Sequence, residues 1–134
     1  MKFRLHRLLD THKFSYVALS EETGHSIYFN ETWLHLLPPQ SLRLPDRHHL
    51  PAERSIELDL QLFEKMLGDF MGQSAYSLAV HFGFKTIVIR YYDARGKLQR
   101  VVDLVPGEDR VMTRVFEFIY PMMEAIHYTV FHSA

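Results

Sequence analysis

Histidine is the residue type in this chain that offers the most chemistry: nine occur among 134 residues, and there is no cysteine. A metal site would therefore have to use imidazoles and carboxylates. The best-spaced pair is Glu124 and His127, which a helix would place on one face. Di-iron bundles need two such motifs and two further glutamates, and only one copy lies on an expected helix. We therefore expect no metal and no cofactor, with Glu124 and His127 as weak candidates.

Two arginines, Arg90 and Arg100, lie on expected neighbouring strands at residues 85–92 and 98–105. The turn between them, with Gly96 in the left-handed position, predicts a hairpin with a G1 bulge. That pairing sets Arg90 directly opposite Arg100, and like charges facing each other destabilise a sheet. Either both side chains spread apart into solvent, or an acidic ligand or partner segment binds them. The pair is our candidate for an anion-binding or partner-binding site.

Trp33 is the third candidate for partner binding. It opens the apolar run 33–37, just ahead of residues 37–51, which contain four prolines and are expected to form a loop. Tryptophan joins a large apolar area to a polar tip and is favoured at binding surfaces. The alternative is that Trp33 packs in the core, as most aromatic residues of so small a chain must.

Nucleophilic catalysis has no recognisable setting in the chain. There is no G-x-S-x-G, no S-x-x-K and no glycine-rich phosphate loop. The acidic pairs Glu21-Glu22 and Glu108-Asp109 lie in an expected turn and at an expected helix start, where solvation and capping explain them. We therefore do not expect an enzyme.

Composition narrows the class of protein further. The formal net charge is -1, with 47% hydrophobic and 23% charged residues, which is typical of one globular domain over residues 1–134. A nucleic-acid-binding domain is normally strongly basic, so we expect no nucleic-acid partner. No stretch resembles a secretory signal or a membrane span. We expect a cytoplasmic protein with no membrane association.

The elements that must position these residues follow from hydrophobic spacing. Residues 3–12 have partial helical spacing, whereas 14–19 and 26–29 read as a hairpin. Residues 53–72 carry an apolar stripe at helical spacing, although 55–61 also alternate as a strand would. Residues 75–82 alternate as a strand.

A long final helix is expected over residues 108–130, with a kink or break at Pro121. It is apolar on two faces, whereas a helix that only covers a sheet needs one. The extra stripe consists of Val111, Val115, Phe118 and Met122. We expect these four residues to form a homodimer interface.

Together these elements predict an α+β fold: an antiparallel sheet of about five strands, helices packed on one side, and a long C-terminal helix. The leading functional hypothesis is a non-enzymatic homodimeric protein-interaction or scaffold module. The alternative is a small-ligand-binding or enzymatic domain with an aromatic-lined pocket between sheet and helices. A well-formed pocket with convergent polar groups and perturbed titratable residues would favour the alternative.

Overall fold

The computed structural model describes residues 1–10, 13–37, 49–59, 65, 77–107 and 109–132. These residues form eight strands and a long helix. The strands are β1 (Lys2–Leu8), β2 (Tyr16–Leu19), β3 (Ser26–Phe29), β4 (Trp33–Leu37), β5 (His49–Glu57), β6 (Ser77–Gly83), β7 (Thr86–Tyr92) and β8 (Leu98–Leu104), and the helix is α2 (Arg110–Phe131).

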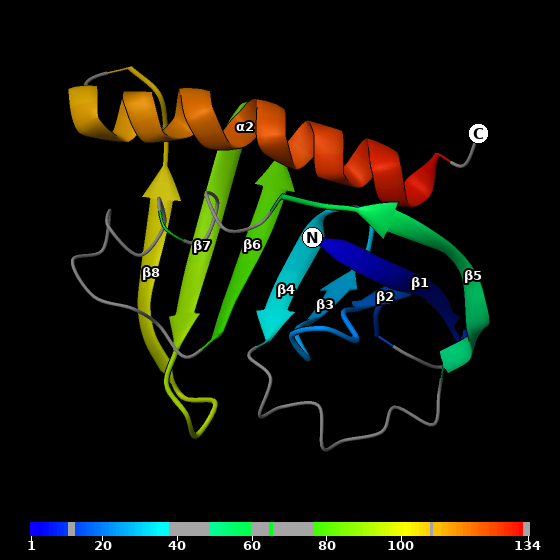
Figure 1. The fold of residues 1–134 in the computed structure, drawn as a ribbon. Coiled ribbons are helices and arrows are strands. Elements are labelled where there is room, and N and C mark those ends of the chain that lie inside the picture. The colour runs from blue at the N-terminus through cyan, green and yellow to red at the C-terminus, as the bar shows by residue number, and fades with distance from the viewer. Residues whose placement is uncertain (11–12, 38–48, 60–64, 66–76, 108, 133–134) are drawn as a thin grey trace.

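All eight strands belong to one sheet with the order β5-β1-β2-β3-β4-β6-β7-β8. Every neighbouring pair runs antiparallel. Successive strands lie side by side, except that β5 returns to pair with β1 at one edge. α2 lies across one face of the curved sheet, with its N-terminal end near β8 and its C-terminal end near β5 (Figure 1).

The expected sheet of about five strands with several helices is therefore wrong. Within the described ranges the sheet has eight strands, and α2 is the one long helix. Residues 3–12, expected as a helix, instead contain β1, where buried Phe3 and Leu5 flank exposed Arg4. Buried and exposed residues thus alternate, as in a strand, and β1 pairs with strands on both sides. These two features favour a strand over the helix that the weaker helical spacing predicted.

The helix expected over residues 53–72 is wrong at its start, whereas the described residue Lys65 is helical. The first residues of this range belong to β5, which pairs with β1, so the strand alternative for 55–61 is correct at residues 55–57. Residues 60–64 and 66–76 lie outside the described residues, as do residues 38–48 of the expected proline-rich loop. The hairpin of β2 and β3 is confirmed.

The hydrophobic core lies between α2 and the face of the sheet that it covers. Strands β4 and β7 alternate buried and more exposed residues, as expected when one face packs against a helix. The largest side chains with almost no exposed surface come from five strands and the helix: Phe3, Phe29, Leu5, Ile27, Leu34, Ile87, Ile89, Leu104 and Ile119. Burial of each stabilises the fold by about 1.5–3 kcal/mol.

Helix α2 confirms the expected C-terminal helix. It begins after Asp109, whose Oδ1 accepts hydrogen bonds from the backbone N–H groups of Val111 and Met112 at 2.8 and 3.1 Å. The helix is not split at Pro121 and continues to Phe131. In the described part of the chain, no helix has both the length and the apolar character that crossing a bilayer requires.

The hairpin of β7 and β8 is confirmed, but its register differs from the expected one. Gly96 has a φ of 79°, and Tyr92 pairs with Leu98 as expected. The next pair is Tyr91 with Arg100, so one extra residue of β8 is bulged. Because a one-residue shift turns side chains to the other face, Arg100 faces away from Arg90, which pairs with Val101. The predicted Arg90–Arg100 repulsion therefore does not arise.

Candidate functional site

A cleft of about 490 Å³ lies between the C-terminal half of α2, the turn between β3 and β4, and the end of β6. It is lined by three aromatic residues, two glutamates and two histidines: Phe82, Tyr128, Phe131, Glu31, Glu124, His127 and His132. Both members of the predicted pair, Glu124 and His127, are in this lining. The cleft is therefore where the sequence-predicted chemistry and a concave surface coincide.

The helix supplies most of the lining because of its periodicity. Residues 124, 127, 128 and 131 follow one another at spacings of three, one and three, so they share one face of α2. Further along the same face, the ring of His132 stacks on that of Tyr128 at 4.8 Å. A single rigid element thus fixes most of the lining side chains relative to one another.

The opposite wall depends on the turn between β3 and β4. Asn30 Oδ1 accepts hydrogen bonds from the backbone N–H groups of Thr32 at 3.0 Å and Trp33 at 2.7 Å, which closes this turn around Glu31. The backbone N–H of Phe82 donates to the carbonyl of Thr32 at 2.7 Å. This bond joins the turn to β6 and places Glu31 and Phe82 beside the helix.

His127 is the central side chain of the cleft and is only 8% exposed. Its Nδ1 donates a hydrogen bond to the carbonyl of Met123 at 3.0 Å, whereas Nε2 has no hydrogen-bond partner among the described residues. The ring stacks with Phe82 at 5.4 Å and with Phe131 at 6.0 Å. A buried polar atom without a partner is costly, so Nε2 is the unusual feature of this site.

The protonation state of His127 follows from its surroundings. Burial lowers its pKa below the ordinary value of 6.5, against the opposing effect of the backbone carbonyls of Met123 and Asn30. The ring is therefore neutral at pH 7. The carbonyl of Met123 can only accept, so the hydrogen bond to it places the proton of the neutral ring on Nδ1. The carbonyl of Asn30 acts on the ring without forming a hydrogen bond to Nε2, which presents a lone pair.

The charges of the cleft have one sign. Glu31 and Glu124 are exposed, and neither makes an ion pair with any described residue. Neither lysine nor arginine is among the described residues of the lining. No group of three or more histidines or carboxylates in the described residues is arranged to hold a metal ion. The cleft therefore offers carboxylates, a neutral imidazole acceptor and aromatic surface.

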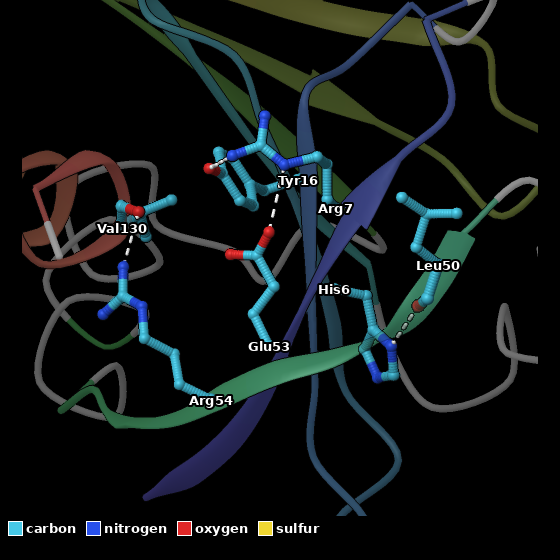
Figure 2. Close-up of polar contacts among 7 residues, drawn as sticks. All are labelled: His6, Arg7, Tyr16, Leu50, Glu53, Arg54 and Val130. Carbon is cyan, nitrogen blue, oxygen red and sulfur yellow. Dashed lines mark hydrogen bonds and ion pairs between the residues drawn. The ribbon is translucent and has the colours of Figure 1, made fainter.

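A polar cluster fixes the C-terminal end of α2 (Figure 2). Arg7 Nε donates to Glu53 Oε1 at 3.0 Å, and Arg7 Nη2 donates to the hydroxyl of Tyr16 at 2.6 Å. The ring of Tyr16 meets that of Phe131 edge-on at 5.4 Å. Through Tyr16 this cluster positions Phe131, which is both a cleft residue and the last residue of α2.

The residues predicted to bind an anion or partner are only partly brought together. Arg90 and Trp33 lie on the face of the sheet opposite the core, with the guanidinium carbon of Arg90 at 4.9 Å from the centre of the Trp33 ring. His81 contacts the same indole ring at 4.8 Å. Arg100 is turned to the other face of the sheet. Trp33 is half-buried at the start of β4, between the exposed anchor and the core residue that the sequence allowed.

The four residues predicted to form a dimer interface differ in exposure. Val111 is 61% exposed, whereas Val115 is 7% exposed and belongs to the hydrophobic core. Phe118 and Met122 are partly buried and pack against that core. The other apolar face of the helix, which contains Ile119, Met123, Ile126 and Val130, is the one that covers the sheet, because all four residues are buried.

Sequence reasoning missed five of the seven lining residues. Tyr128, Phe131 and His132 follow from helical spacing once His127 is chosen, so the signal was present. Glu31 and Phe82 carry no such signal, because only the pairing of β4 with β6 brings the β3–β4 turn next to α2.

Comparison with known proteins adds no further identification. The chain matches no model of a protein family, no curated protein and no solved structure.

Proposed function

We propose that this protein binds a small molecule in the cleft between α2, the β3–β4 turn and β6. The observation that carries the proposal is His127: a side chain 92% buried (8% exposed) lines the cleft with an unpartnered Nε2. A ligand donor at this atom would remove the cost of leaving it unsatisfied.

The size and lining of the cleft support the same function. Small-molecule sites typically have volumes of about 300–1,000 Å³ and combine aromatic walls with a few placed polar groups. The cleft has a volume of about 490 Å³ with three aromatic residues and four ionisable ones. Burial is the main cause of the lowered pKa of His127, and a titratable group with a perturbed pKa in a cleft is a further sign of a functional site.

The experiment is a fragment screen by ligand-observed NMR, with hits mapped by chemical-shift changes in ¹⁵N-labelled protein. We expect the hits to shift the amides of β6 and of residues 124–132. The variant Glu31→Trp, which adds a large ring to the cleft lining, should abolish these shifts. Glu22→Trp places the same ring in the β2–β3 turn and should leave them intact. A screen without hits at the cleft would overturn the proposal.

The homodimeric interaction module remains a second candidate, favoured by a different surface. β8 is an edge strand of the sheet, and Leu98, Val101 and Val105 are 45%, 50% and 54% exposed. Exposed apolar edge strands are templates for pairing with another chain. Val111, at the start of α2, is also exposed, so a dimer through β8 would use one residue of the predicted stripe.

A second copy fits this edge by antiparallel pairing of β8 with itself. With Val101 opposite its symmetry mate, each Arg100 faces Val102 and no like charges oppose. Light scattering tests this candidate: we expect twice the chain mass of 15.9 kDa, and a monomer for Val101→Lys. The matched change Val88→Lys lies on an interior strand of the same sheet, away from this edge. It should either leave the dimer intact or unfold the chain, so a folded monomer is not expected. A monomeric parent protein would rule the candidate out.

A further inference from the structure

We infer that the ligand of the cleft is an organic cation, a primary or secondary ammonium group carried on an apolar body. The inference rests on the proposed function and specifies its ligand class. Three properties of the lining lead to it: its charge, its hydrogen-bonding character and its aromatic surface.

The charge of the lining favours a cation. Glu31 and Glu124 come from opposite walls, one from the β3–β4 turn and the other from α2. Both carboxylates are free of ion pairs within the described residues, and no lysine or arginine of the described lining offsets them. A cleft lined by charges of one sign concentrates ligands of the opposite sign. A carboxylate or phosphate ligand would meet repulsion from both walls.

The hydrogen-bonding groups of the lining call for a donor. His127 already uses its Nδ1–H on Met123 at 3.0 Å, and its unpartnered Nε2 is an acceptor. Ionised carboxylates are acceptors only. An ammonium group supplies two or three N–H donors and no acceptor, so it matches Glu31, Glu124 and His127. A neutral alcohol supplies one donor and leaves the carboxylate charges without a counter-charge.

The aromatic residues complete the match. Phe82 and Phe131 both stack with the ring of His127, at 5.4 and 6.0 Å, and Tyr128 lines the same cleft. A ligand held at Nε2 therefore lies beside aromatic rings. The same rings provide the apolar contact that an alkyl or aryl body requires.

Four probes that share a phenylethyl body separate these contributions in isothermal titration calorimetry of the untagged protein. They are 2-phenylethylammonium, its N,N,N-trimethyl analogue, 2-phenylethanol and 3-phenylpropionate. At about pH 8 the amine is protonated while an unperturbed imidazole is neutral. We expect 2-phenylethylammonium to bind about tenfold more tightly than the alcohol. The trimethyl analogue should lie between them because it keeps the charge and loses the donors, and the carboxylate should not bind.

Two variants assign the preference to named side chains. Glu124→Gln removes a charge at constant size and should weaken the ammonium probe about tenfold while leaving the alcohol unchanged. Glu117→Gln makes the same change at an exposed position of α2 outside the lining and should have no effect. His127→Phe preserves ring packing and should abolish the preference for the ammonium over its trimethyl analogue. Thermal unfolding of each variant verifies that it is folded.

The outcomes separate the ligand class from the proposed function. If the alcohol or the carboxylate binds as tightly as the ammonium and shifts the amides of residues 124–132, the cleft binds ligands but the cation inference is wrong. If Glu124→Gln and Glu117→Gln weaken the ammonium probe equally, the attraction is general and the inference is also wrong. If no probe and no fragment reaches the cleft, the proposed function itself fails.

Discussion

Arg54 Nη2 donates a hydrogen bond to the backbone carbonyl of Val130 at 2.8 Å, joining residues 76 positions apart in the chain. Arg54 belongs to β5, the edge strand that closes the sheet beside β1, and Val130 lies in the last turn of α2 (Figure 2). The last carbonyls of a helix have no intrahelical partner and carry partial negative charge. The contact therefore ties an edge of the sheet to the helix end that bears the cleft.

Replacing Arg54 by methionine should remove this tie while keeping most of the packing of the side chain. We expect Arg54→Met to lower the free energy of unfolding by about 1–2 kcal/mol. Arg4→Met is the matched control: Arg4 lies on β1 and forms an ion pair with Glu21, in which both side chains are more than half exposed, so its loss should cost less than about 0.5 kcal/mol. Urea unfolding measures both values. Equal effects of the two changes would contradict the role given to Arg54.

The N-terminal cap of α2 gives a second prediction. Asp109 accepts from two backbone N–H groups that have no partner within the helix, so Asp109→Ala should lower the free energy of unfolding by about 1 kcal/mol. Asp109→Asn keeps an accepting oxygen and should retain most of that stability. The control is Asp103→Ala, an exposed change on β8, where the side chain forms no hydrogen bond with the described residues. Chemical denaturation of the three variants tests the order of their stabilities.

The turn between β7 and β8 gives a third prediction, which depends on backbone conformation alone. Gly96 has a φ of 79°, and a Cβ added there would meet no atom within 4 Å. Gly96→Ala should therefore cost about 1–2 kcal/mol from the left-handed conformation and nothing from steric overlap. Asparagine tolerates this conformation better, so Gly96→Asn should cost less. If alanine and asparagine are equally harmful in thermal unfolding, another cause must be sought.

Features that depend on residues close together in the sequence were predicted, and features that depend on long-range pairing were not. The β7–β8 turn and the start of α2 were predictable because Gly96 and Asp109 act on their own neighbours. β1 was missed because Phe3 and Leu5 give a short alternating pattern that only pairing with β2 and β5 makes decisive. The orientation of Arg100 was missed because a single bulged residue reverses it.

The same distinction between local and long-range features applies to the cleft. Glu124 and His127 were recognisable as a pair because one helix sets their spacing. Their surroundings were not, because Phe82 reaches His127 only after β6 pairs with β4 and α2 packs across the sheet. The buried state of His127 was equally hidden, since its isolation from water depends on Phe29, Phe82 and Phe131.

Stability against pH gives the last prediction, because two histidines have lowered pKa values. Burial lowers the pKa of His127, and burial followed by the charge of Lys13 lowers that of His35, both from 6.5. Below pH 6.5 the unfolded chain takes up protons that the folded protein resists, so stability is full above pH 6.5 and falls as the pH drops toward the folded pKa values. We expect the Tm to decrease steadily on acidification from about pH 7.5 to about pH 5.

His127→Phe should flatten part of this decrease, because it removes one of the two groups while preserving the ring stack. His132→Gln, at an exposed position of the same helix end, leaves both buried imidazoles in place and should keep the full slope. Calorimetric melting curves of the three proteins across this pH range measure the difference. A parallel decrease for the parent protein and His127→Phe would show that His127 is not held neutral in the folded state.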